Sequence, residues 1–106
     1  MVGKIKIGDT EYNAECCLKT FVDYKNSTGK EFLKVYSEAA DATADGSDIE
    51  KLTQIVFERA RIIYALITDD ITIDDIHKYD FGEILTAFTV AAELINRSLT
   101  VSRKNA

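Results

Sequence analysis

Proline and tryptophan are absent from the sequence, and only five of its 106 residues are glycine. Proline and glycine are the residues that most often end helices and form turns, so their scarcity favours long helices over many short strands. The longest apolar run covers only residues 62–67, whereas a membrane-spanning helix needs about 20 apolar residues. The chain also opens without a signal-peptide pattern. We therefore expect one soluble domain that stays in the compartment where it is made.

The chain has only two cysteines, and they are neighbours in the sequence. A disulfide between Cys16 and Cys17 would be strained, and the pair lacks the ligand spacing of a zinc site. We expect reduced thiols, at least one of them buried.

The net charge of −5 is unevenly distributed, because twelve of the 18 acidic residues lie within residues 35–83. Proteins that bind the phosphate backbone of nucleic acids need clustered lysine and arginine. The acidic middle of the chain therefore speaks against a nucleic-acid partner.

The start of the chain alternates apolar and polar residues, as β-strands do. Within residues 4–16, Ile5 and Ile7 alternate with lysines, and the pair Gly8-Asp9 makes a turn of the right length for a β-hairpin. A lone hairpin is marginally stable in water, so its apolar face must dock on the segments that follow.

The remainder of the chain has the spacing of amphipathic helices, which we expect over residues 18–29, 30–44 and 48–67, after Thr72, and from Asp80 onward. The predicted fold is α+β and mostly α: an N-terminal β-hairpin packed on a bundle of about four to five helices. Residues 1–100 should form a single domain and 101–106 a frayed tail. The first two helices should bury Leu18, Phe21, Val22, Phe32, Leu33, Tyr36 and Ala40.

Residues 41–52, DATADGSDIEKL, resemble a calcium loop in their acids and central glycine. Leu52 stands where such a loop has its bidentate glutamate, so calcium binding is disfavoured. A phosphopantetheine site at Ser47 is disfavoured as well, because Asp48 follows it where an aliphatic residue is wanted. Ser47 with Glu50 matches a capping box, which predicts a joint between two helices.

The helix expected over residues 48–67 has an unusually wide apolar face, which implies neighbours on several sides. Arg59 falls inside this apolar sector, and we expect it to pair with a carboxylate. The apolar stripe consists of Ile49, Leu52, Val56, Ala60, Ile63 and Ile67, flanked by Ile55, Ile62 and Leu66 on one side and Phe57 and Tyr64 on the other.

Two pairs of neighbouring aspartates lie within residues 69–75, where close carboxylates could serve acid–base or metal chemistry. Thr72 with Asp75 also matches a capping box, and capping is the favoured interpretation. His77 is predicted to lie on the surface rather than to form a dyad with Cys16. We find no nucleophile–base pair, metal cluster or phosphate loop in the sequence, so we expect no enzymatic activity and no cofactor.

The last helix begins at Asp80, with Glu83 completing a third box, and carries two apolar stripes. The main stripe consists of Phe81, Ile84, Leu85, Phe88, Ala91, Ala92, Ile95 and Leu99. The lesser stripe consists of Ala87, Val90, Leu94 and Val101. This second stripe either buries against another helix of the chain or forms an exposed strip, and exposed strips mark interfaces. Ala87, Val90 and Leu94 are our first candidates for protein binding, and the rim Phe57, Arg61 and Tyr64 the second.

Residues 4–36 form a predicted hairpin that leads into the pattern F-x-x-x-K-x-x-T-G-K-x-F, which resembles the tail assembly chaperones of long-tailed bacteriophages. The order of residues 58–67 and 71–88 resembles that family too, so the similarity covers nearly the whole chain. The matching positions, which we expect to form a helix–helix corner rather than a site, are Phe21, Lys25, Thr28, Gly29, Lys30 and Phe32.

The resemblance implies a non-enzymatic protein that coats the tape measure protein and keeps this long helical chain soluble. It also implies recruitment of the tail tube protein, action in the cytoplasm of the bacterial host, and absence from the mature virion. The apolar strip of the last helix could contact the tape measure protein or, by self-association, another copy of this protein. An acidic domain with a spare apolar strip is compatible with shielding amphipathic helices in a groove. Neither nucleic acid nor a membrane is an expected partner.

Two alternatives stay open. One is a small helical DNA-binding or regulatory protein-interaction domain, which the acidic balance disfavours. The other is an enzyme that uses the acids of residues 69–75, for which a response to divalent metal would be evidence.

The resemblance further implies a second, longer product made by a minus-one ribosomal frameshift. Lys104-Asn105 can supply the slippery run, since the codons AAA AAC preceded by an A allow both tRNAs to pair again after sliding one base. Arg103 permits that A, because two arginine codons end in it. Sequencing the coding DNA checks this prediction: a codon 103 that does not end in A, or the lack of an open frame past Ala106, would contradict it.

Overall fold

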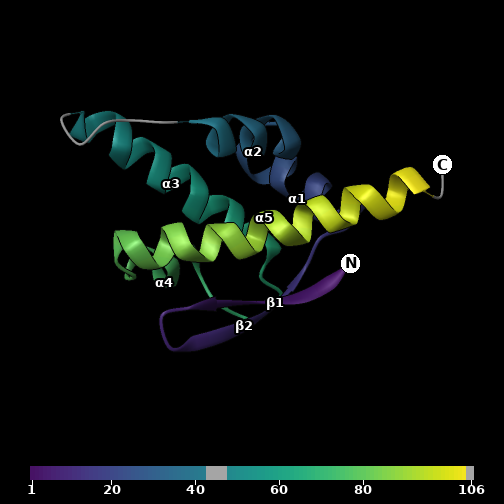
Figure 1. Cartoon of the computed structure of the whole chain (residues 1–106), viewed down its shortest axis with the longest axis horizontal. Coiled ribbons are helices and arrows are strands. Elements are labelled where there is room, and N and C mark those ends of the chain that lie inside the picture. The colour runs from purple at the N-terminus through teal and green to yellow at the C-terminus, as the bar shows by residue number, and fades with distance from the viewer. Residues whose placement is uncertain (43–47, 105–106) are drawn as a thin grey trace.

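The chain begins with an antiparallel hairpin, and over residues 1–42 and 48–104, which the computed structural model describes, five helices follow it (Figure 1). The elements are β1 (Val2–Ile7), β2 (Thr10–Glu15), α1 (Leu18–Thr28), α2 (Phe32–Asp41), α3 (Ile49–Leu66), α4 (Ile73–His77) and α5 (Phe81–Lys104). The predicted α+β, mostly α fold with an N-terminal hairpin is confirmed.

The hairpin turns at Gly8, whose positive φ of 59° is the left-handed conformation that glycine adopts without strain. Ile5 and Ile7 are fully buried beneath α5, as their alternation with lysine predicted. On the other side, β2 is joined to the segment after α3, where Thr68 N donates to Asn13 O at 2.9 Å. The hairpin is therefore held by both a helix and a backbone segment.

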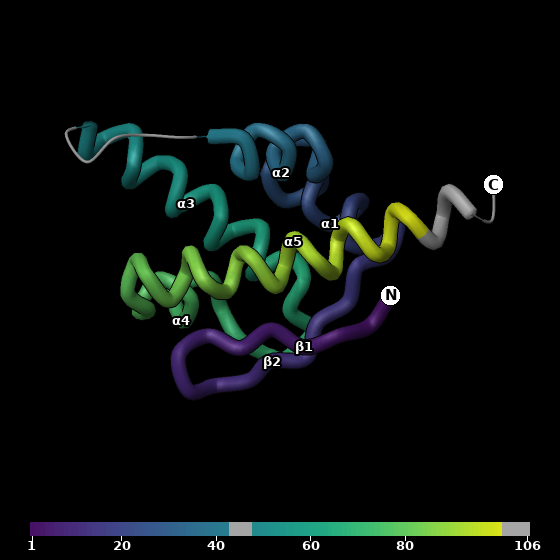
Figure 2. The backbone as a smooth tube through the Cα atoms, viewed as in Figure 1, coloured from purple at the N-terminus to yellow at the C-terminus, as the bar shows by residue number. Residues whose placement is uncertain are grey.

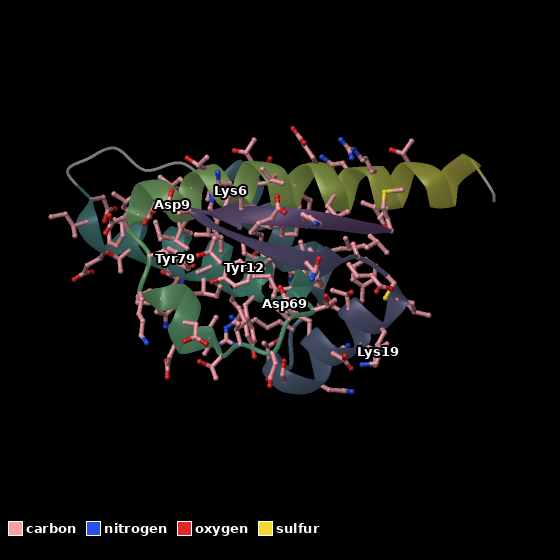
Figure 3. The ribbon with its side chains drawn as sticks, turned by 90° about the horizontal axis from the view of Figure 1, so that it is seen from below. Lys6, Asp9, Tyr12, Lys19, Asp69 and Tyr79 are labelled. Atoms are coloured by element: carbon pink, nitrogen blue, oxygen red, sulfur yellow. The ribbon has the colours of Figure 1, made fainter. Side chains whose placement is uncertain are left out.

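A second contact fixes the hairpin to the segment after α4. The hydroxyls of Tyr12 and Tyr79 lie 2.6 Å apart, and this hydrogen bond is the main cause that raises the pKa of Tyr12 to about 12 (Figure 3).

The core lies where α3 and α5 cross, with the hairpin on one side of α5 and α1 and α2 on the other (Figure 2). Two isoleucines of α3, Ile62 and Ile63, and Ile95 of α5 are fully buried there. The predicted stripe of α3 is confirmed in its middle, at Val56, Ala60 and Ile63, whereas Ile49 at its start is 70% exposed.

The corner between α1 and α2 is built by the residues of the sequence pattern, as predicted. Gly29 adopts the left-handed conformation at φ 75° and donates to Lys25 O, which ends α1. Thr28 accepts from Lys30 N at 3.1 Å, and the Phe21 and Phe32 rings stack with centroids 5.1 Å apart. These contacts give the pattern a structural role.

The predicted inward faces of α1 and α2 are only partly correct: Phe32 is buried and Phe21 is half-buried against the core, but Leu18, Val22, Leu33 and Ala40 are exposed. Leu18 and Val22 are 76% and 48% exposed, and α1 buries Thr20 and Tyr24 instead. In α2 the buried residues are Phe32, Val35 and Ala39, whereas Leu33 is 39% exposed, Ala40 is exposed and Tyr36 is half-buried. Phe32 packs between the two helices, where its ring stacks on Phe21 and meets the edge of Tyr24.

Arg59 meets a backbone carbonyl and not the carboxylate that we predicted. Its Nε and Nη2 donate to Ala39 O at 3.2 and 2.9 Å, and its guanidinium lies 4.9 Å from the centre of the Phe88 ring. A helix C-terminus leaves carbonyls without intrahelical partners and carries a partial negative charge. Arg59 therefore caps α2 and stacks on α5 at the same time.

Helix caps form where the sequence predicted them, except that the N-cap of α3 is Asp48 and not Ser47. Asp48 is the N-cap of α3 and accepts from Lys51 N at 3.1 Å, while Ser47, our predicted N-cap, lies outside the described residues. The predicted box of Thr72 and Asp75 is confirmed, with Thr72 N donating to Asp75 at 2.8 Å. At the start of α5, Asp80 N donates to Glu83 at 3.0 Å.

The frayed tail expected over residues 101–106 stays a prediction. Helix α5 continues to Lys104, and residues 105–106 lie outside the described part of the structure.

Candidate protein-binding surfaces

The strip Ala87, Val90 and Leu94 is part of the core and not an exposed surface. Ala87 is fully buried, Leu94 is 6% exposed and Val90 is half-buried. A Cβ added to Gly3 of β1 would lie only 3.2 Å from Leu94 Cδ1, so Leu94 packs closely against the hairpin. Our first candidate surface is therefore corrected: the strip buries within the chain, and at Leu94 it packs against β1 of the hairpin.

The rim Phe57, Arg61 and Tyr64 does lie at an open surface, along α3. Two neighbouring hollows of about 320 and 350 Å³ meet there and share Tyr24, Ser27 and Arg61. Phe57 lines the first hollow and Tyr64 the second. We call this surface the α3 groove and define it by Tyr24, Ser27, Phe57, Arg61 and Tyr64.

The α3 groove combines apolar rings with a cation. Phe57 is 55% exposed, and the His77 ring lies edge-on to it at 5.5 Å. Arg61 is exposed and forms no salt bridge within the described residues. Burial raises the pKa of Tyr24, and the nearby Arg61 charge opposes that shift. The groove can accept an apolar side chain at Phe57 and a carboxylate at Arg61.

A second open surface, which sequence reasoning assigned to the core, is the apolar face of α1. We call it the α1 face and define it by the exposed Leu18 and Val22, with the half-buried Phe21 at its inner edge. It borders a hollow of about 410 Å³ lined by Met1, Cys16, Cys17, Leu18, Phe21, Ser98 and Leu99. The apolar spacing in the sequence did signal this face, but the spacing alone does not say whether a face is covered.

Two of the four acids within residues 69–75, Asp69 and Asp75, serve as hydrogen-bond acceptors. Asp69 accepts from both the backbone and the side-chain nitrogen of Asn13, at 2.8 and 3.1 Å. The backbone hydrogen bond from Thr72 is the main cause that lowers the pKa of Asp75. Within residues 1–42 and 48–104, no group of three or more potential metal ligands gathers.

Cys16 and His77 have different neighbours. Cys16 is buried, which raises the pKa of its thiol, and its carbonyl accepts from Ser98 Oγ. His77 is exposed, as predicted, and lies against Phe57. The structure does not bring the two side chains together as a catalytic dyad would require.

No protein-family model matches the chain, and neither the curated proteins nor the solved structures contain a match to it. Over the described residues, no helix combines the length and the apolar character that crossing a membrane requires.

Proposed function

We propose that this protein is a non-enzymatic tail assembly chaperone of a long-tailed bacteriophage or prophage. It binds the tape measure protein, keeps that long helical chain soluble and helps to recruit the tail tube protein. It acts in the cytoplasm of the bacterial host and leaves before the virion is mature. The proposal combines the sequence resemblance with one structural observation, the α1 face.

The α1 face supports the proposal because it is apolar surface that the fold does not use. The hairpin, α3 and α5 already close the core around fully buried isoleucines, yet Leu18 and Val22 remain 76% and 48% exposed. Exposed apolar side chains that share one helix face mark interaction sites. An amphipathic helix that offers its own apolar stripe would bury both stripes, as helix-in-groove complexes do.

The test is co-expression with the tape measure protein, followed by measurement of its soluble fraction and of co-purification. Leu18→Glu with Val22→Glu should leave the chaperone folded, because both positions are exposed, and should leave the tape measure protein in the insoluble fraction. Gln54→Glu with Thr89→Glu adds the same two carboxylates at exposed polar positions and should behave like the wild type.

A third variant separates the two surfaces. Phe57→Glu with Arg61→Glu alters the α3 groove and spares the α1 face. Loss of co-purification in this variant alone would move the binding site to the α3 groove. If all variants keep the tape measure protein soluble, neither surface binds it and the proposal is wrong.

A further inference from the structure

The outer edge of β1 is an open backbone edge, and it is distinct from the α1 face and the α3 groove. In an antiparallel pair, residues alternate between those that bond across the pair and those whose N–H and C=O point away. Asn13 points away from β1, since its N–H donates to Asp69 and its C=O accepts from Thr68 N. Asn13 lies opposite Lys4, so the backbone groups of Lys4 point away from β2.

The same alternation turns the backbone groups of Val2 and Lys6 outward. Within the described residues, no hydrogen bond reaches the outward N–H and C=O groups of Val2, Lys4 and Lys6. All three residues are exposed. The edge of β2 differs, because Asp69 and Thr68 cover it at Asn13, and Thr20 Oγ1 donates to Glu15 O at 3.2 Å. Figure 3 shows Lys6 and Asp69 on opposite sides of the sheet.

The space beside the outer edge of β1 is bordered by α5 on one face of the sheet and by lysine side chains on the other. Helix α5 packs over β1, and in Figure 3 it extends beyond the strand on the side away from β2. Val90 is half-buried and shares one side of α5 with Leu94, which lies against Gly3 of β1. On the opposite, solvent face, Lys4 and Lys6 are exposed; Lys4 forms a salt bridge with Glu11 of β2 at 3.4 Å, and Lys6 has no carboxylate partner within the described residues.

We propose that the edge of β1 binds an extended segment of a partner protein as a third strand, with acidic residues alternating with apolar ones. The acids would lie beside Lys4 and Lys6, and the apolar side chains would pack under α5 at Val90. Backbone hydrogen bonds supply affinity in such strand addition, and alternate side chains supply specificity. A second copy is disfavoured as the occupant, because two antiparallel β1 strands would set lysines beside lysines.

The test uses a blocked heptapeptide of sequence TEVEVET as the probe and amide hydrogen exchange of the full chain as the readout. Saturating peptide should slow exchange at Val2, Lys4 and Lys6 and leave Gly3, Ile5 and Ile7 unchanged, because only the first three N–H groups point outward. When the peptide pairs so that its glutamates lie opposite the outward residues of β1, the glutamates lie beside Lys4 and Lys6. A peptide N-methylated at its glutamate nitrogens keeps every side chain but loses these donors, and should bind more weakly by on the order of tenfold.

A charge swap provides the control on the protein side. Lys4→Glu with Lys6→Glu should weaken binding of TEVEVET by on the order of tenfold and favour the peptide TKVKVKT to a similar extent. Because binding of TKVKVKT requires a folded protein, it would show that the weaker binding of TEVEVET comes from lost charge complementarity and not from unfolding.

Three results would overturn the proposal. The first is the absence of binding at millimolar peptide, and the second is binding without the alternating protection. The third is protection of Val2, Lys4 and Lys6 that rises with protein concentration alone, which would identify a second copy as the occupant.

Discussion

Leu94→Lys should unfold the protein or lower its free energy of unfolding by at least about 3 kcal/mol. Leu94 is 6% exposed and lies against Gly3, so the substitution removes one of the apolar contacts between α5 and β1. The lysine adds a charge beneath the hairpin, and burying a charge without a partner is costly. Since a domain of this size has a total stability of about 5–15 kcal/mol, the loss would be a large part of it. Urea denaturation followed by circular dichroism measures the change.

The matched control is Leu18→Lys, the same chemical change at a residue that is 76% exposed. Its free energy of unfolding should stay within about 0.5 kcal/mol of the wild type, as is usual for surface substitutions. A Leu94→Lys variant as stable as this control would mean that the hairpin leaves α5 readily. The strip Ala87, Val90 and Leu94 would then be accessible after all and would return as a candidate binding surface.

The parts of the fold that follow from short sequence signals were predicted correctly. The hairpin depends on Gly8 and on the alternation of Ile5 and Ile7, which specify a turn and a buried face within a few residues. The start of α4 depends on Thr72 and Asp75, which are neighbours on one turn. In each case the interacting groups are close in sequence, so no knowledge of distant contacts is needed.

The parts that depend on contacts between distant segments were not predictable. Arg59 was expected to find a carboxylate, but it binds the carbonyl of Ala39, twenty residues earlier. Every residue except proline presents the same donor and acceptor pair on its backbone, so a sequence does not show which carbonyl a side chain reaches. The same limit applies to α1. Its apolar residues were expected to face the core, but Leu18 and Val22 on that face are exposed to solvent.

The candidate binding surfaces include residues that were predicted from the sequence and residues that were missed. Phe57 and Tyr64 were identified because they flank the apolar stripe of α3, and Arg61 as part of the same rim; the structure places the three along one groove. The opposite wall, at Tyr24 and Ser27, comes from α1 and had no signal of its own. The open edge of β1 was missed for a similar reason: which edge of a hairpin stays uncovered depends on residues 67–69, far along the chain.

Phe32→Ala should lower the free energy of unfolding by about 3–5 kcal/mol, the usual cost of removing a buried phenylalanine. Phe32 is 1% exposed, stacks on Phe21 and meets the edge of Tyr24 at 5.3 Å. These aromatic pairs hold α1 against α2. The short connection between the helices adds no packing at Gly29, which has open space around it. The substitution therefore removes both the buried ring and the contact that orients the α1 face.

Leu33→Ala, one residue further along the same helix, is the matched comparison. The sequence pattern assigned both residues to the core, but Leu33 is 39% exposed, so its truncation should cost less than about 1 kcal/mol. Urea denaturation measures how much each substitution lowers the free energy of unfolding, and the ratio of the two decreases tests the orientation of α2 directly. Equal losses would mean that both residues are buried, and that α2 is rotated so that the apolar side of this corner faces inward. The exposure of Leu18 and Val22 would then no longer follow, and the α1 face would lose its place as the binding surface.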